Sequence, residues 1–242
     1  MNETSHGGRA YTPGMFTKHR LAEVAALFGD PGRAGMVMSL WDGTARPAGE
    51  LARIAGVAPA TASAHLARLV SGGLLRVERR GRHRYYRLAG PAVAQALESL
   101  AGVLPLHGPG VHVEAAEDPI RCARLCYDHV AGRLGVAISD ALVAKRWLAL
   151  DAGAYVLGPA GRHGFERFGV DVAALERGRR PLLRSCIDWT ERREHLGGAL
   201  GAALANHLLE RDWLRRQRGV RTLLVTTAGR AGLRDALGLR VA

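Results

Sequence analysis

The sequence predicts an α+β fold that is mainly helical, with small β-hairpins, in two successive domains. Three observations predict this class. Apolar residues recur at helical spacing along most of the chain, short runs rich in strand formers follow several predicted helices, and a segment rich in Gly and Pro interrupts the pattern near the middle. A chain of 242 residues with 48% hydrophobic and 23% charged residues can bury a sizeable core, and this charge argues against disorder and against a membrane span.

The predicted boundaries follow the changes in composition. Residues 1–16 form a flexible N-terminus, residues 17–104 a first domain, residues 105–119 a linker, and residues 120–242 a second domain. The N-terminus has no apolar segment of the kind that signal peptides carry, and the longest apolar stretches are too short or too interrupted to cross a bilayer. We therefore expect a cytoplasmic protein.

The first domain begins with helical segments over residues 21–28 and 36–41, followed by a third over residues 48–55 that Pro47 opens. A turn containing Gly56 leads into a fourth helix over residues 59–70, and two helices joined in this way predict a helix-turn-helix. In the fourth helix, Ala62, Leu66 and Leu69 are predicted to point inward. The polar side chains remain for its outer face.

A basic β-hairpin is predicted directly after these helices. Two alternating runs meet at the basic turn of residues 79–82, and residues 76–87 hold six arginines against the single acid Glu78. The whole chain has 34 Lys and Arg against 22 Asp and Glu, a net charge of +12, and a sequence pI of about 10.8. This excess predicts an anionic partner, because arginine makes forked contacts to phosphates. A further helix is predicted over residues 91–104.

Together these elements predict a winged helix-turn-helix, with the hairpin as its wing and double-stranded DNA as its partner. The candidate DNA-binding residues lie on the outer face of the fourth helix and along the wing: they are Thr61, Ser63, His65, Arg68, Arg79, Arg80, Arg82 and His83. A merely solvated basic hairpin is the plainer interpretation of the wing.

Residues from Met15 to about Leu104, somewhat over a third of the chain, resemble the ArsR/SmtB type of bacterial winged-helix repressors. The resemblance is carried by Glu50-Leu51-Ala52, Gly56-Val57, the run 61–66, Leu69, Gly73-Leu74-Leu75 and the wing 79–86. It implies a homodimer in which the first helix and the helix from Pro91 pair across a two-fold axis. It also implies that two recognition helices meet a palindromic operator.

The sequence departs from this family at two places. Pro59 stands where family members commonly carry a polar residue, often glutamine, so one base-reading side chain is missing. The metal sites of the family are missing too, because Ala52 and its neighbours replace the expected cysteines, and the helix 91–104 carries Gln95 and Glu98 but no histidine. The familiar sensor positions of the winged helix therefore cannot bind soft or borderline metals.

The second domain contains all three cysteines of the chain. A helix from near Ile120 is predicted to carry Cys122, Cys126 and His129 on one face, at i, i+4 and i+7, and Cys186 follows much later. Thiolates and imidazoles are ligands for zinc, copper(I) or trivalent arsenic, and thiols in an electropositive chain suit redox chemistry. Cys122, Cys126, His129 and Cys186 are therefore the candidates for metal binding or thiol sensing. Plain core packing is the alternative for each of them.

A repeated pattern in the second domain predicts further hairpins. Trp147-Leu148 and Trp213-Leu214 each end a helix, and each leads through a strand-like stretch to the sequence Ala-Gly-Arg, at residues 160–162 and 228–230. The first of these hairpins is truncated around residues 151–153. The second follows a helix over residues 196–209 and has a basic tip over residues 215–219. We therefore predict a second, degenerate winged-helix-like domain that serves effector sensing and adds dimer surface.

The predicted function is a sequence-specific DNA-binding transcriptional regulator, a homodimeric repressor that leaves its operator when an effector acts on the second domain. The effector is left open among a metal or metalloid, a thiol-reactive species and a small molecule, so a thiolate-bound metal or metalloid is the one cofactor considered. A weakly specific, architectural DNA-binding protein without an effector is the alternative. We expect neither an enzyme nor a membrane partner, since the chain has no Gly-x-Ser-x-Gly, phosphate-binding loop or His-Glu-x-x-His motif.

Overall fold

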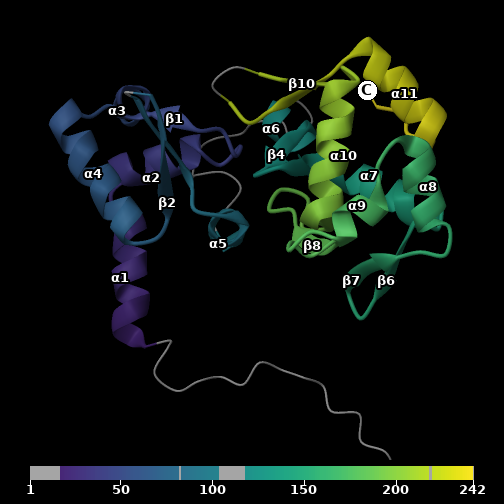
Figure 1. The fold of residues 1–242 in the computed structure, drawn as a ribbon, viewed down its shortest axis with the longest axis horizontal. Helices are drawn as coiled ribbons and strands as arrows, with labels where there is room; N and C mark the ends of the chain where they lie inside the picture. Colours follow the sequence, from purple (N-terminus) through teal and green to yellow (C-terminus); the bar gives the residue numbers. More distant parts are fainter. Residues whose placement is uncertain (1–16, 82, 104–117, 218–219, 242) are drawn as a thin grey trace, which may run out of the picture.

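Two helical halves, each with its own hydrophobic core, make up the computed structural model of the protein (Figure 1). The structure describes residues 17–81, 83–103, 118–217 and 220–241. One core joins buried residues between Leu27 and Leu97, and the other joins buried residues between Ala123 and Leu237. The predicted N-terminus 1–16 and most of the predicted linker lie outside the described residues.

The first half contains the helices and the hairpin that the sequence predicts. In chain order its elements are α1 (Lys18–Phe28), α2 (Pro31–Ser39), β1 (Arg46–Pro47), α3 (Ala48–Ala55), α4 (Pro59–Ser71), β2 (Leu75–Arg80), β3 (His83–Leu88) and α5 (Pro91–Val103). Asp30 caps α2 by accepting a hydrogen bond from the backbone of Arg33. Gly56 ends α3 in the left-handed conformation, with φ at 64°, and so sets the turn into α4.

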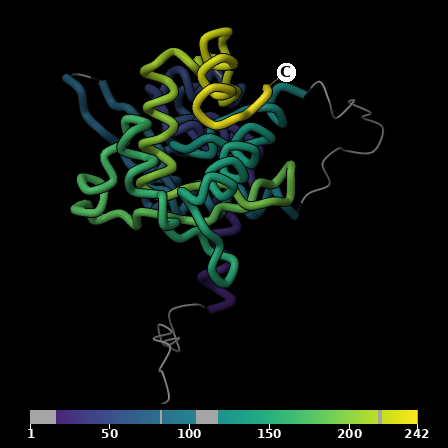
Figure 2. The backbone as a smooth tube through the Cα atoms, turned by 90° about the vertical axis from the view of Figure 1, so that its right-hand side faces the viewer, coloured from purple at the N-terminus to yellow at the C-terminus, as the bar shows by residue number. Residues whose placement is uncertain are grey.

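Strand β3 lies in the middle of a three-stranded antiparallel sheet with the order β1-β3-β2. Strand β1 was not predicted, because two residues are too few to carry an alternating pattern. Ala62, Leu66 and Leu69 of α4 are buried, as predicted, and Leu51 of α3 is fully buried as well. The β2–β3 hairpin, the wing, projects beyond the rest of the protein at the upper left of Figure 2.

The second half consists of short hairpins and helices in regular alternation. Its elements are α6 (Pro119–Cys122), β4 (Arg124–Cys126), β5 (His129–Ala131), α7 (Gly132–Ala144), β6 (Leu148–Asp151), β7 (Ala154–Leu157), α8 (Gly161–Phe168), α9 (Val172–Glu176), β8 (Arg184–Ile187), β9 (Glu194–Gly197), α10 (Gly198–Glu210), β10 (Leu214–Arg216), β11 (Leu223–Val225) and α11 (Thr227–Leu237). No helix in the described ranges is both long and apolar enough to cross a membrane.

The predicted hairpins after Trp147 and Trp213 are confirmed as β6–β7 and β10–β11. The predicted helix carrying Cys122, Cys126 and His129 is wrong. Helix α6 ends at Cys122, and Cys126 and His129 face each other across the β4–β5 hairpin. Tyr127, in the turn between them, adopts the left-handed conformation with φ at 64°, so two residues suffice to reverse the chain.

The second half is an internal duplication. A hairpin, a helix, a second hairpin and a second helix occur once as β4–β5–α7–β6–β7–α8 and again as β8–β9–α10–β10–β11–α11. Gly132 and Gly198 open the first helix of each unit with φ at 75° and 83°. The same spacing separates His129 from His195 and Trp147 from Trp213. The predicted second winged-helix-like domain is thus two copies of one smaller unit.

Each unit packs its first hairpin against the helix of the other unit. Strand β9 lies against α7, and strand β5 lies against α10. The Leu196 backbone N–H of β9 donates to Ser139 Oγ of α7, at 2.9 Å, and that hydroxyl is fully buried. Glycines also let each helix lie close to the hairpin of its own unit, because a Cβ at Gly135 of α7 would lie 2.4 Å from the Val130 carbonyl oxygen of β5, and one at Gly201 of α10 2.5 Å from that of Leu196 of β9.

A second pair of glycines lets α8 and α11 approach the tryptophans. A Cβ at Gly229 would lie 2.0 Å from the Trp213 carbonyl oxygen, whereas nothing lies within 4 Å of the corresponding point at Gly49 in α3. We expect Gly229→Ala to lower the free energy of unfolding by about 1–3 kcal/mol or more through overpacking. Gly49→Ala is expected to raise it by about 0.4–1 kcal/mol, because alanine restricts the unfolded chain.

Urea unfolding followed by circular dichroism measures both changes. Equal stability of Gly229→Ala and the natural protein would contradict the tight approach of α11 to Trp213.

The two halves meet along α5 and the β4–β5 hairpin. The Tyr127 backbone N–H donates to the Trp41 carbonyl oxygen at 3.0 Å, and Arg216 donates to the Asp42 carbonyl oxygen at 3.3 Å. The Arg221 guanidinium lies 3.7 Å from the centre of the Trp41 ring, a cation–π contact. The second half therefore contacts the end of the α2 segment as well as α5.

Candidate functional site

The outer face of α4 is built from small side chains. Thr61, Ser63 and Arg68 are exposed, and the remaining exposed positions of the helix are Pro59, several alanines and Ser71 at its end. The Ser63 hydroxyl donates to the Pro59 carbonyl oxygen at 3.0 Å. Because these side chains are short, the α4 backbone can approach the floor of a DNA groove closely, with few side chains that reach base edges.

His65 differs from the prediction that it faces DNA. Its side chain is only 15% exposed, and its Nε2 lies 3.4 Å from Asp30 Oδ1. Asp30 also caps α2, and the hydrogen bond from the Arg33 backbone is the main reason that the pKa of Asp30 is lowered. His65 therefore ties α4 to the start of α2, a structural role that its place on the helix did not indicate.

The wing presents basic side chains that face each other. Arg79 lies opposite Arg84, and Arg80 lies opposite His83 in the β2–β3 register. Like charges directly opposite in a hairpin are destabilising. Arg79 and Arg84 are exposed and have no carboxylate partner among the residues that the structure describes. Arg82 lies outside the described residues.

Glu78 gathers the other arginines of the wing. It lies 3.0 Å from Arg87, 3.5 Å from Arg80 and 3.7 Å from Arg76, and the Arg87 hydrogen bond is the main reason that its pKa is lowered. Arg87 also donates to the Gly43 carbonyl oxygen at 3.1 Å, so it fixes the wing to the loop between α2 and β1. Among the described arginines of the wing, Arg79 and Arg84 are therefore those that Glu78 leaves for an anion.

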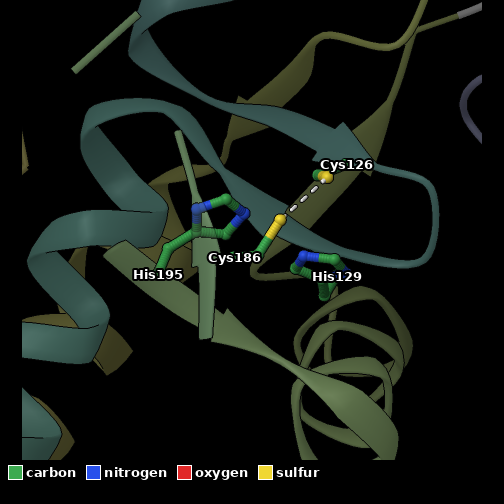
Figure 3. A group of neighbouring side chains, drawn as sticks. All are labelled: Cys126, His129, Cys186 and His195. Atoms are coloured by element: carbon green, nitrogen blue, oxygen red, sulfur yellow. Dashed lines mark hydrogen bonds between the residues drawn. The ribbon is translucent and has the colours of Figure 1, made fainter. Parts of the chain in front are cut away.

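In the second half, two hairpins bring Cys126, His129, Cys186 and His195 together (Figure 3). Cys126 faces His129 in β4–β5, and Cys186 faces His195 in β8–β9. All four residues are buried, their candidate ligand atoms lie within 4.8 Å of one another, and the two sulfur atoms are 3.7 Å apart. Three of the predicted residues belong to this Cys/His cluster. Cys122 does not, and its sulfur accepts a hydrogen bond from Arg133 at 2.8 Å.

The imidazoles of the Cys/His cluster have buried nitrogens with no hydrogen-bond partner among the described residues. These are Nε2 of His129 and both nitrogens of His195. The other nitrogen of His129, Nδ1, lies 3.2 Å from Asp128 Oδ1. Leaving a buried polar atom unpaired costs about 1–3 kcal/mol. Three such atoms at one point make the Cys/His cluster a candidate site for a bound ion or water.

The two thiols of the Cys/His cluster differ in acidity. The pKa of Cys186 is lowered because the Cys126 thiol hydrogen-bonds to it and because the two imidazoles lie beside it. The pKa of Cys126 is raised by that same hydrogen bond and by burial. Burial opposes the charging of His129, but its contacts with Asp128 and Cys186 outweigh burial and raise the pKa of His129. The lowered pKa of Cys186 and the raised pKa of His129 thus favour opposite charges on neighbouring side chains.

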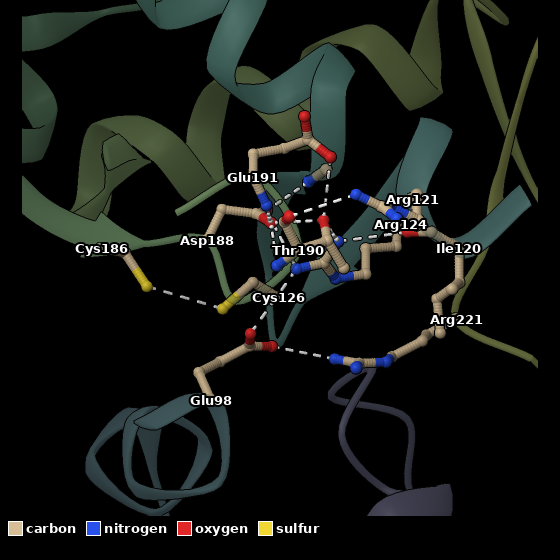
Figure 4. A network of polar contacts seen from close by, with 11 residues as sticks. Glu98, Ile120, Arg121, Arg124, Cys126, Cys186, Asp188, Thr190, Glu191 and Arg221 are labelled. Atoms are coloured by element: carbon tan, nitrogen blue, oxygen red, sulfur yellow. Dashed lines mark hydrogen bonds and ion pairs between the residues drawn. The ribbon is translucent and has the colours of Figure 1, made fainter. Parts of the chain in front are cut away.

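A buried ionic network lies beside the Cys/His cluster (Figure 4). Arg124 is 0% exposed, and it donates to Asp188 at 2.9 Å and to the Thr190 hydroxyl at 3.2 Å. Asp188 also accepts from the Gly132 backbone at 2.6 Å. Burial raises the pKa of Asp188, and Arg124 with these hydrogen bonds more than reverses this, so the carboxylate stays ionised.

The network continues into the first half through Glu98 of α5. Its carboxylate lies 3.7 Å from Arg124 and 2.9 Å from Arg221, and all three side chains are nearly inaccessible to solvent. Arg124 and Asp188 are each two residues from a cluster cysteine. The Cys/His cluster and α5 therefore share one set of buried charges.

His195 was not predicted, although the sequence holds a signal for it. The motif Arg-x-Cys-x-Asp occurs at residues 124–128 and at 184–188, and a histidine follows each copy. Three residues after this histidine, the first copy continues with Gly-Arg-Leu-Gly and the second with Gly-Ala-Leu-Gly. Aligning the copies pairs His129 with His195. The longer turn of the second copy, residues 189–193, hides this correspondence.

Comparison with known proteins supports the description of the first half. A family model described as "Helix-turn-helix domain" matches residues 28–78. The HTH-type transcriptional regulator YdfF of Bacillus subtilis strain 168 is 36% identical over 222 residues, which cover 91% of this chain and 98% of YdfF. The chain belongs to the HTH-type transcriptional regulators. It is thus a DNA-binding regulator, and the structure confirms the predicted winged helix, because the β2–β3 hairpin follows the helix-turn-helix of α3 and α4.

Two solved structures each match less than half of this regulator. The transcriptional repressor BigR of Xylella fastidiosa is 24% identical, with a TM-score of 0.33, and the match covers 37% of this chain and 90% of BigR. A homodimeric winged helix-turn-helix domain of Mycobacterium bovis, described as a possible ArsR-family regulator, is 31% identical, with a TM-score of 0.32, covering 39% of this chain and 89% of that domain.

Proposed function

We propose that this regulator is a homodimeric repressor that binds a palindromic operator and leaves it when an effector acts on the second half. The observation that carries the DNA-binding part is the pair Arg79 and Arg84, two like charges opposite each other on the exposed wing, with no carboxylate partner in the part of the chain that the structure describes. A DNA phosphate relieves this repulsion. Bringing many such phosphates and cations together releases counterions, which is a large part of protein–DNA affinity.

The proposed DNA contacts divide between groove and backbone. Thr61, Ser63 and Arg68 on α4 are the groove contacts, and Arg79, Arg80 and Arg84 on the wing are the phosphate contacts. Arg82 and His83 remain predictions for the wing. His65 is left out because Asp30 holds it. Because Pro59 and alanines occupy much of the outer face of α4, the specificity for DNA sequence depends on few side chains and on DNA shape.

Apolar side chains exposed on α1 and α5 support the dimer. Leu21 and Val24 are exposed on α1, and Leu100 and Val103 are exposed on α5, Val103 at 82%. Exposed apolar residues gathered on two helices of a winged helix favour burial against a second copy. A dimer built this way places two α4 helices about 34–36 Å apart, one turn of DNA, which a palindromic operator matches. The proposal includes the cytoplasmic location that access to DNA requires.

Footprinting on the promoter DNA of this regulator tests the proposal. We expect a two-fold symmetric protected site and a dissociation constant at physiological salt at least about 10³-fold below that for a random duplex. Light scattering on the free protein is expected to give twice the mass of one chain. Equal affinity for promoter and random duplex, with no symmetric footprint, would instead favour the architectural alternative, which the small side chains on α4 make physically reasonable.

A further inference from the structure

We propose that Cys126, His129, Cys186 and His195 bind one divalent cation of the zinc class in tetrahedral geometry, and that this ion is the effector. The inference about the effector rests on the proposed function, whereas ion binding itself does not. Two thiolates and two imidazoles are the donor set of closed, four-coordinate zinc sites. The site is therefore of the closed type, in which protein ligands fill all four positions and none is open for catalysis.

The spacing of the sulfur atoms fits such an ion. In a regular tetrahedron with zinc–sulfur bonds of about 2.3 Å, two sulfur ligands lie about 3.8 Å apart. The Cys126 and Cys186 sulfur atoms are 3.7 Å apart, whereas a disulfide requires about 2.05 Å. All four donors lie within 4.8 Å of one another, as ligands of a single ion must. The sulfur pair already has the spacing of a tetrahedral site, and small side-chain shifts would bring the imidazoles to bonding distance.

The histidines are oriented for coordination. Asp128 Oδ1 lies 3.2 Å from Nδ1 of His129 and leaves Nε2, which is buried and has no hydrogen-bond partner among the described residues, for a metal ion. A carboxylate that fixes the tautomer of a ligating histidine is the usual outer partner in zinc sites. Asp128 is itself held by both guanidinium nitrogens of Arg180. His195 contributes an imidazole whose two nitrogens are both buried and unpaired among the described residues.

The donor chemistry favours zinc over the other candidates. Two thiolates carry two negative charges and two neutral imidazoles carry none, so a site that binds a divalent cation has no net charge. A site without net charge is favourable here because the cluster is buried away from water. Copper(I) and arsenic(III) favour sets richer in sulfur, which two cysteines do not supply. The duplication explains the symmetry of the site, because each unit contributes one cysteine and one histidine from the same register positions.

The position of the cluster gives the ion a route to the first half. It joins two hairpins, and Tyr127, in the turn of the first, donates its backbone N–H to the Trp41 carbonyl oxygen. The network of Arg124, Asp188 and Glu98 links the same hairpins to α5, the proposed dimer helix. An ion that holds the hairpins together thereby favours one placement of α5, and with it one separation of the two recognition helices.

Ion binding is tested on the full-length protein, stripped with a chelator and titrated with Zn²⁺ or Co²⁺. We expect one ion per chain by elemental analysis, and a Co²⁺ spectrum with thiolate charge transfer and intense tetrahedral bands. Cys186→Ser and His195→Gln are each expected to weaken binding at least about 100-fold. Cys122→Ser is the matched control, since this cysteine lies outside the cluster, and it is expected to keep one ion.

Two further measurements keep the test decisive. Asp128→Asn retains all four ligands and is expected to weaken Zn²⁺ binding about 10–100-fold, so the site can be tested even if a ligand variant fails to fold. Mass spectrometry on protein purified in air reports a Cys126–Cys186 disulfide as a loss of two hydrogens. Such a disulfide with no bound ion, or full Zn²⁺ affinity in His195→Gln, would overturn the metal site.

The regulatory part is measured by operator affinity with and without Zn²⁺. We expect a change of about 5- to 150-fold, the usual range of coupling between two sites. One ion per chain with unchanged operator affinity would contradict the effector role but not the metal site. Absence of operator binding both with and without Zn²⁺ would instead contradict the proposed function, because the number of bound ions does not depend on DNA.

Discussion

Replacing Arg124 with methionine is expected to lower the free energy of unfolding by about 3–5 kcal/mol, among the largest effects of any single substitution here. Methionine fills much of the same volume but leaves the Asp188 and Glu98 carboxylates buried without their shared cation, and breaking a buried pair from one side costs this much. The measurement is urea unfolding followed by circular dichroism and tryptophan fluorescence, with chelator present.

The duplication supplies a matched control for this change. Arg184 occupies the position of Arg124 in the second unit but is exposed, so Arg184→Met is expected to change stability by less than about 0.5 kcal/mol. The contrast isolates the buried network from the loss of one positive charge. Similar stabilities for the two variants would show that the network of Arg124 contributes little to the fold.

Reversing the charge of the wing is expected to have the largest effect on DNA binding. Arg79→Glu with Arg84→Glu removes four proposed phosphate contacts from a dimer, so the slope of log affinity against log salt should fall by about 3 to 4. At 0.15 M salt we expect binding at least about 100-fold weaker. The loss should be similar for operator and random duplex, because phosphate contacts carry no sequence information. Fluorescence anisotropy at several salt concentrations measures all three quantities.

The control for the wing is the same charge change placed elsewhere. Arg177→Glu with Arg179→Glu alters two exposed arginines just after α9 in the second half. This variant should keep the salt slope of the natural protein to within about one unit, since only general repulsion changes. If both double variants lost affinity equally, the wing would be no more than one part of a diffuse basic surface.

The winged helix was predictable because its signals are local. Each helix of the first half has an apolar period, and a capping residue, a proline or a glycine marks where several of them start or stop. His65 shows the limit of such patterns. Its place on the outer half of α4 suggested DNA, whereas Asp30, from a different helix, decides where its side chain lies.

The Cys/His cluster was only partly predictable, for two physical reasons. Cys126 and His129 fit the spacing of a helix face as well as that of a hairpin, and Tyr127 and Asp128 lack the glycine or asparagine that normally signals a two-residue turn. His195 comes from a second hairpin whose turn is longer than the first. Spacing along one segment cannot reveal a site assembled from two segments.

The crossed packing of the two units makes each unit of the second half depend on the other for its core. Since β5 lies against α10 and β9 against α7, neither unit has a complete interior by itself. In a protein with only one such unit, the surface that covers each hairpin would have to come from another chain. Duplication places an interface that would otherwise join two chains inside a single polypeptide. The two units that form this interface are therefore always present in equal number.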